Sequence, residues 1–225
     1  RPSMLAENYI DNEIPVLKIS DTVRTAVKKM EEANIAQLPV VDEHSFLGML
    51  TSSTAYMVQD PKLTIKGIQL LNPTFDIYPH THVLEVLKIA GDSELDILPV
   101  LNKENKNFVG SIRKVSLFNF FEQMYGTKAS GSILVLSLLE RDYSLNEISR
   151  IVESNGAKIL TVFTEAPDNT PFQMLVTLKI NLADISRVIV ALQRHHYHVV
   201  YSYHEEEYKS KDQERLEQLL KFLEI

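Results

Sequence analysis

The chain has 225 residues, of which 44% are hydrophobic and 24% are charged, a composition typical of one large globular domain or two small ones. Its net charge of −7 argues against nucleic acid as a partner, because neutralising phosphates requires clustered Lys and Arg. No apolar run reaches the roughly 18 residues of a membrane span, and no secretory signal is recognisable. Cys is absent, which excludes disulfides and thiol catalysis. We therefore expect a cytoplasmic protein without a membrane or nucleic-acid partner.

An internal repeat organises the first half of the chain. Residues 17–41 and 77–101 match without a gap at a spacing of about 60 residues, and both contain Leu-Pro-Val. Gly48 then matches Gly110 slightly out of step, because the loop "NKENKN" is longer than "DEHS". The repeat predicts a duplicated small domain, since a solenoid needs shorter repeats and more of them.

Each copy predicts the same order of elements. Ser20 or Asp21 caps the first helix. Apolar residues follow the helical repeat in both copies: Val23, Ala26, Val27 and Met30, then Val83, Val86, Leu87 and Ala90. Strands are expected at 38–41, 46–50, 98–101 and 108–112, and second helices at 54–58 and 115–125. Each copy is a βαββα unit, with boundaries at 1–67 and 68–126.

A different pattern follows Gly126. Strands are expected at 132–139, 157–164, 172–180 and 197–204. One helix opens at the capping box Ser144-x-x-Glu147, and Asp184 caps another. This βαββαβ order predicts a ferredoxin-like domain over 130–205. Residues 206–225 are charged and then predict a helix with an apolar face, which docks on the body or on a partner. The fold class is α+β.

The doubled units, each with Leu-Pro-Val and then Gly-x-x-(Thr/Ser) or its variant, resemble a pair of CBS domains, known as a Bateman module. The third part resembles an ACT domain, and the order is similar to bacterial acetoin-utilisation-type proteins. The resemblance implies a regulatory protein that binds an adenine nucleotide (AMP, ADP or ATP) or S-adenosylmethionine. It also implies a homodimer, formed through the CBS pair and the ACT-like domain, which signals to an unknown downstream protein.

The nucleotide motif of such units is Gly-x-x-(Thr/Ser)-x-x-Asp, in which the Asp accepts both ribose hydroxyls. The first copy has Thr54 at the Asp position and the second has Ser116, so the carboxylate is replaced in both. The matching positions give these ligand-binding candidates: Val16, Leu17, Gln37, Leu38, Pro39, Thr51, Ser52, Ser53, Thr54, Tyr78, Ile97, Leu98, Arg113, Lys114 and Ser116. The alternative is that the hydroxyls are helix caps, the cations are solvated and the apolar residues are core.

Two function hypotheses remain open. The hydroxyl run and the cations Arg113 and Lys114 favour a sensor of an adenine compound. The replaced carboxylates favour a ligand-free module for dimerisation and protein contacts. In the ACT-like part, Tyr143 stands where the ligand loop of the family has glycine, which favours a role in dimerisation. In the strand 197–204, alternation places Val199 and Tyr201 on one face and His198 and His204 on the other, together with His196. A polar surface is favoured over a metal site on the histidine face, and no enzyme motif is present.

Overall fold

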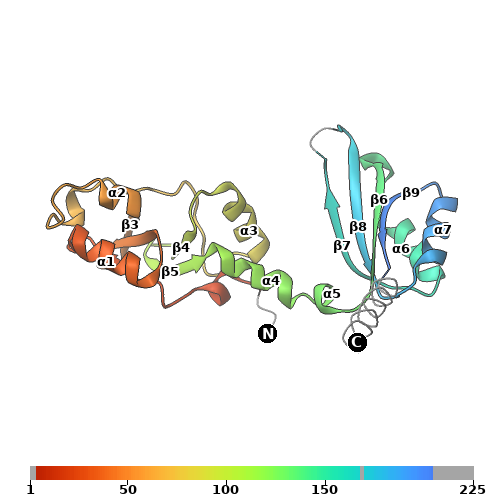
Figure 1. The fold of residues 1–225 in the computed structure, drawn as a ribbon, viewed down its shortest axis with the longest axis horizontal. Coiled ribbons are helices and arrows are strands. Elements are labelled where there is room, and N and C mark those ends of the chain that lie inside the picture. Colours follow the sequence, from red (N-terminus) through yellow and green to blue (C-terminus); the bar gives the residue numbers. More distant parts are fainter. Residues whose placement is uncertain (1–3, 168–169, 205–225) are drawn as a thin grey trace, which may run out of the picture. The chain divides into compact units, whose positions relative to one another are not determined.

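The computed structural model describes residues 4–167 and 170–204 (Figure 1). The chain divides after Glu122 into two compact units. The segment 206–225, for which the sequence predicts a helix, lies outside the described residues. Within the described ranges, no helix combines the length and apolarity needed to cross a membrane.

The first copy of the repeat forms a sheet of three strands in the order β1-β2-β3. β1 (Leu17–Lys18) runs parallel to β2 (Gln37–Asp42), and β2 is antiparallel to β3 (Ser45–Thr51). α1 (Val23–Ala33) connects β1 to β2, and α2 (Ser52–Tyr56) follows β3. The short 3-10 turn Ala6–Tyr9 precedes β1.

The second copy repeats this order with a weaker first strand. β4 (Ile97–Leu101) pairs with β5 (Phe108–Arg113), and the first strand is reduced to a parallel bridge between Ile77 and Val100. α3 (Val83–Asp92) precedes β4. Further 3-10 turns and helices occupy these ranges: Ile65–Gly67, Lys114–Leu117, α4 (Phe118–Gln123) and α5 (Tyr125–Lys128).

The strand register confirms that the two copies are equivalent. Val40 pairs with Gly48 in the first hairpin, and Val100 pairs with Gly110 in the second. A register shift follows Val40 and another follows Val100, so each hairpin has an irregularity at the same place. The duplication read from the sequence is therefore a duplication of structure.

The two copies exchange the segments that precede their first strands. We call residues 4–14 the first strap and residues 63–74 the second strap. The first strap packs on the second copy, where Ile10 forms a bridge with Ile112. The second strap packs on the first copy, where Leu71 forms a bridge with Met49. The same exchange occurs at the helix starts, where Val83 and Val23 donate backbone hydrogen bonds to Met4 (2.8 Å) and Leu63 (2.9 Å).

The helix starts differ in detail from the prediction. Thr22, and not Ser20 or Asp21, caps α1, since its hydroxyl accepts the N–H of Thr25 at 3.2 Å. Asp21 instead pairs with Lys29 (3.0 Å). The second helices also differ: α2 begins at Ser52, and the predicted helix 115–125 divides into a 3-10 turn and α4, with α5 beginning at Tyr125.

The second unit has the predicted strand-helix-strand-strand-helix-strand order. Its elements are β6 (Ser132–Leu139), α6 (Leu145–Ser154), β7 (Ile159–Glu165), β8 (Gln173–Ile180), α7 (Ser186–Arg194) and β9 (His198–Tyr203). The strands form one antiparallel sheet in the order β7-β8-β6-β9, and both helices pack on the same face (Figure 1). Ser144 caps α6 as predicted, accepting the N–H of Glu147 at 3.3 Å.

A bulge in β9 corrects the predicted faces of that strand. Val199 pairs with Leu136 and Tyr201 pairs with Val135, so Val200 is an extra residue between them. Because neighbouring residues of β6 point to opposite faces, Tyr201 leaves the face that Val199 shares with the core. Tyr201 is accordingly 54% exposed.

Candidate ligand-binding pocket

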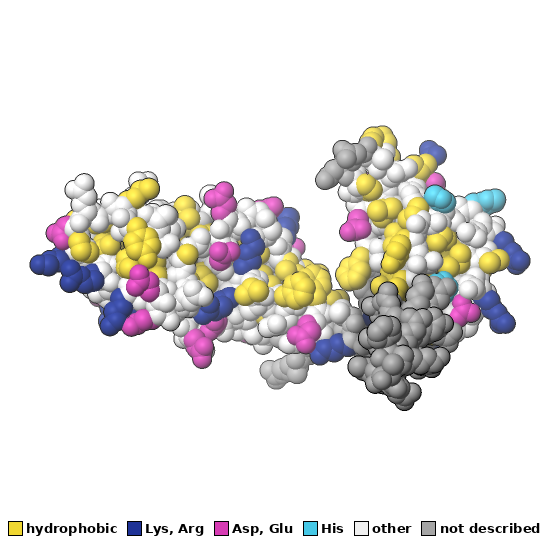
Figure 2. All heavy atoms as spheres, viewed as in Figure 1, with side chains coloured by type: hydrophobic (Ala, Val, Ile, Leu, Met, Phe, Trp, Pro, Cys, Tyr) yellow, Lys and Arg dark blue, Asp and Glu magenta, His cyan; other side chains and the backbone are white. Residues whose placement is uncertain are grey.

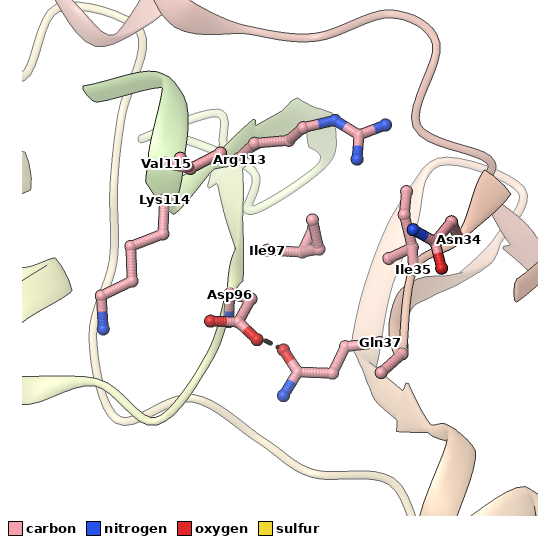
Figure 3. A pocket seen from close by; sticks show the side chains of 9 residues that line it. Asn34, Ile35, Gln37, Asp96, Ile97, Arg113, Lys114 and Val115 are labelled. Carbon is pink, nitrogen blue, oxygen red and sulfur yellow. Dashed lines mark hydrogen bonds between the residues drawn. The ribbon is translucent and has the colours of Figure 1, made fainter. Parts of the chain in front are cut away.

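A pocket of about 510 Å³ lies in the first unit where three segments from the two copies meet (Figure 3). The end of α1 and the start of β2 contribute one side, the start of β4 contributes another, and the end of β5 contributes the third. The lining residues are Asn34, Ile35, Ala36, Gln37, Asp96, Ile97, Arg113, Lys114 and Val115.

Backbone hydrogen bonds of the repeat hold these segments. The carbonyl of Ala36 accepts the N–H of Ser52 at 2.7 Å, and the carbonyl of Asp96 accepts the N–H of Lys114 at 2.7 Å. The Gln37 side-chain oxygen accepts the Asp96 N–H at 2.9 Å and thereby joins the two copies across the pocket. The pocket is therefore built on contacts between β2 and the turn that precedes β4.

The chemical character of the walls is mixed. Ile35 and Ile97 are 7% and 3% exposed and give the pocket an apolar floor, whereas Val115 is 76% exposed at its edge. Asn34, which ends α1 in a left-handed conformation (φ 53°), and Gln37 present amides. Such a combination suits a planar, partly polar molecule.

Arg113 is held by the first strap. Its Nε donates to Asp11 Oδ2 at 2.6 Å, and this hydrogen bond is the main cause that lowers the pKa of Asp11 from its ordinary value of 3.8. Figure 3 shows the guanidinium extending from the end of β5 toward Asn34 and Ile35. One cationic group therefore reaches over the pocket with a carboxylate already bound to it.

Lys114 does not join Arg113. In Figure 3 the Arg113 side chain leaves the end of β5 and the Lys114 side chain leaves the start of the following 3-10 turn, and the two point away from each other. The Lys114 ammonium donates to the carbonyl of Ser93 at 2.8 Å, at the C-terminal end of α3, where the helix dipole favours a cation. Although Lys114 lines the pocket, its charge stabilises the end of a helix.

The pocket brings together four of the residues proposed from the sequence. These are Gln37, Ile97, Arg113 and Lys114. Tyr78 lines a separate pocket of about 540 Å³, with the segments 79–81 and 102–104. The remaining candidates are not among the lining residues of either pocket: Val16, Leu17, Leu38, Pro39, Thr51, Ser52, Ser53, Thr54, Leu98 and Ser116.

Those remaining candidates have structural contacts. Leu17, Leu38 and Leu98 are fully buried. The Thr51 hydroxyl accepts the N–H of Thr54 at 3.2 Å and lies 2.9 Å from the Ser53 hydroxyl, so the hydroxyl run acts as a helix cap. Pro39 is also buried. The other three candidates make hydrogen bonds: the Val16 carbonyl accepts from Lys29 Nζ (3.1 Å), the Ser52 N–H donates to the Ala36 carbonyl, and the Ser116 hydroxyl donates to the Arg113 carbonyl (2.7 Å).

Asp96 is an ionisable residue that lines the pocket and that the sequence analysis did not propose. The family motif places its carboxylate at positions 54 and 116, whereas Asp96 reaches the pocket from the turn before β4. It is exposed, so its carboxylate is available to a ligand. Asp96 aligns with Ala36 in the repeat, and that difference between copies was the available signal.

On the face that Figure 2 shows, basic and acidic side chains are interspersed over both units. Among the described residues, no group of three or more His, Asp or Glu side chains is arranged to hold a metal ion.

Comparison with known proteins identifies the first copy. Residues 6–55 match the family model of the CBS domain. The first copy is a CBS domain. The matched range begins within the first strap and ends in α2. The fold of the chain is a mixed α+β fold in which this domain is followed by a second copy with the same strand register.

Similar proteins of known sequence or structure cover about half of the chain. An inosine-5'-monophosphate dehydrogenase from Korarchaeum cryptofilum is 26% identical over 113 residues, which are 50% of this chain and 23% of that relative's length. The CBS domains of a transcriptional regulator from Streptococcus pneumoniae are 18% identical, with a TM-score of 0.47 over 52% of this chain and 98% of that one. A CBS domain pair/ACT domain protein from Thermotoga maritima is 17% identical, with a TM-score of 0.48 over 54% and 99%.

Proposed function

We propose that residues 4–122 form a CBS pair that binds an adenine nucleotide or an adenosyl compound and regulates another protein, without catalysing a reaction. The observation that carries the proposal is the pocket, which lies between a CBS domain and its structural repeat. It combines an apolar floor, two amides, a carboxylate and a guanidinium within about 510 Å³. This volume is in the range typical of small-molecule sites.

Each part of such a ligand has a matching group. Ile35 and Ile97 offer apolar surface to a purine ring, and the amides of Asn34 and Gln37 suit its polar edge. Asp96 supplies a carboxylate that accepts from the two ribose hydroxyls. The usual motif positions cannot do so, because they carry Thr54 and Ser116. The guanidinium of Arg113 accompanies the 5' substituent.

Thermal unfolding of the full chain with ATP, ADP, AMP and S-adenosylmethionine tests the proposal. A ligand at about 100 times its dissociation constant adds about 2.7 kcal/mol, which moves the midpoint by about 2–4 °C. Arg113→Gln should reduce the shift for compounds with a charged 5' group. Arg24→Gln is the matched control, because Arg24 is exposed on α1 and does not line the pocket. Unchanged midpoints with every compound would overturn the proposal.

A second candidate function is a ligand-free module for assembly. The capping hydroxyls of Thr51–Thr54 and the internal partners of Arg113 and Lys114 favour it, because each group already has a structural use. In that case the wild-type chain dimerises with no midpoint shift from any adenine compound. Sedimentation equilibrium with and without ligand separates the two functions.

We further propose that the second unit is an ACT-like domain that contributes to a homodimer and passes the change to a downstream protein. A ligand changes dimer geometry only if it prefers one arrangement of the copies. Dimerisation and a cytoplasmic location remain predictions. Measuring the mass of the chain in solution tests the first, and localising the tagged chain in cells tests the second.

A further inference from the structure

An ion pair at the pocket depends on the exchange of straps. Asp11 belongs to the first strap, and its Oδ2 lies 2.6 Å from Nε of Arg113 in the second copy. Its other oxygen accepts the backbone N–H of Glu13 at 2.9 Å. The Asp11 side chain is 25% exposed and the Arg113 side chain 32%. The carboxylate is therefore partly shielded from water, and each of its oxygens accepts a hydrogen bond.

The backbone fixes the position of this carboxylate. The N–H of Asp11 donates to the carbonyl of Ser111 at 2.8 Å, and the preceding Ile10 forms a bridge with Ile112. Asp11 cannot move away from Arg113 by a strap displacement without breaking these contacts. A ligand anion thus meets a guanidinium whose Nε is occupied.

The equivalent place in the first copy lacks both charges. Leu71 of the second strap makes two backbone hydrogen bonds with Met49, at 2.8 and 2.9 Å. Asp11 makes the equivalent of one of them, from its N–H to the carbonyl of Ser111. Thr51 ends β3 where Arg113 ends β5. The ion pair is consequently a property of this chain at one of two equivalent places, and the CBS fold does not require it.

We infer that Asp11 determines which ligand charge the pocket accepts. The pocket favours a nucleoside compound whose own charges sum to zero and disfavours a nucleoside polyphosphate. The inference rests on the proposed function. Asp11 offsets Arg113, and Asp96 offsets the charge of Lys114, whose ammonium is held at the end of α3, so these four formal charges sum to zero. A polyphosphate would add several negative charges next to two carboxylates and find one guanidinium already paired.

Titration calorimetry of the full chain with ATP, adenosine and inorganic pyrophosphate tests the inference. In the wild type, adenosine should bind at least as tightly as ATP. Asp11→Asn keeps the shape and an acceptor for Glu13, and should tighten ATP and pyrophosphate about tenfold while adenosine stays within about twofold. Glu13→Gln is the matched control, since it removes the same charge from an exposed neighbour on the same strap and should change none of the three.

The outcomes separate this inference from the proposed function. If ATP binds the wild type more tightly than adenosine, or if Asp11→Asn and Glu13→Gln act alike, the inference is wrong and the nucleotide site stands. If no nucleoside compound binds any of the three proteins, the proposed function is wrong. The inference falls with it when pyrophosphate affinity is also the same in all three. Selective tightening of the two anions in Asp11→Asn supports it.

Discussion

Replacing Gly110 by Ala tests the strap exchange on which the pocket depends. A Cβ at this position would lie 2.5 Å from Ile10 Cγ2, closer than carbon atoms approach. Ile10 cannot yield by a rotation of its far end, because Cγ2 is attached to its own Cβ and the strap backbone is bonded to β5 through Asp11. Overpacking of this kind costs about 1–3 kcal/mol of unfolding free energy.

Ile10→Ala provides the compensating change. Alone, it removes partly buried methyl groups and should cost about 1–2 kcal/mol. Combined with Gly110→Ala, it removes the atom that clashes, so the double variant should be more stable than the sum of the single effects by about 1–3 kcal/mol. Gly48→Ala is the matched control, because its Cβ meets Asn72 Oδ1 at 2.8 Å and Leu70 Cβ at 2.9 Å in the other strap.

Urea unfolding followed by circular dichroism measures the cycle, with the first unit's transition fitted separately from the second. The expected result is strong coupling between positions 10 and 110 and additivity between positions 10 and 48. Additive effects at 10 and 110 would refute the packing of the first strap on β5. In that case the position of Asp11 beside Arg113 would also lose its support.

Three more predictions follow from contacts near the pocket and in the second unit. Thr51→Ala should cost about 1 kcal/mol in urea unfolding by removing the cap on Thr54, with nucleoside affinity within about twofold; a large affinity loss would contradict the capping role. Asp96→Asn should weaken adenosine about tenfold and 2',3'-dideoxyadenosine hardly at all in calorimetry, and equal effects would exclude contact with the ribose diol. Burial and a hydrogen bond to Glu147 raise the pKa of Tyr197 from 10.0 to about 12. The neutral phenol therefore adds stability that is fully present below pH 10 and is lost as pH rises through 12. Tyr197→Phe should abolish this part of the pH dependence, worth about 3 kcal/mol, and an equally steep alkaline curve in both proteins would disprove it.

The sequence predicted the elements well because the duplication supplied two readings of the same pattern. Apolar spacing located α1 and α3, and the shared Leu-Pro-Val located β2 and β4. The caps were less predictable, since Ser20, Asp21 and Thr22 are all good capping residues and only backbone geometry selects Thr22. The face of Tyr201 was mispredicted because a bulge leaves no signature in alternation.

The pocket was less predictable than the fold. Matching positions to a motif placed Arg113 and Lys114 together, whereas their side chains run in opposite directions and bind Asp11 and Ser93. The motif contains neither Asp11 nor Ser93, so it could not predict these contacts. Asp11 is distant in sequence from Arg113, and a contact of this kind appears only when the strap is packed on the other copy.

The strap exchange also explains how one repeat produces two chemically different places. Duplication gives both hairpins the same register, so Thr51 and Arg113 occupy equivalent ends of β3 and β5. Each end is then completed by a residue from the other copy's strap, Leu71 in one case and Asp11 in the other. A substitution in a strap therefore changes the charge of one pocket without disturbing the sheet that forms it. Because Thr51 and Leu71 stand at the first copy's end in place of Arg113 and Asp11, we expect the proposed selectivity for ligand charge at the second copy's end.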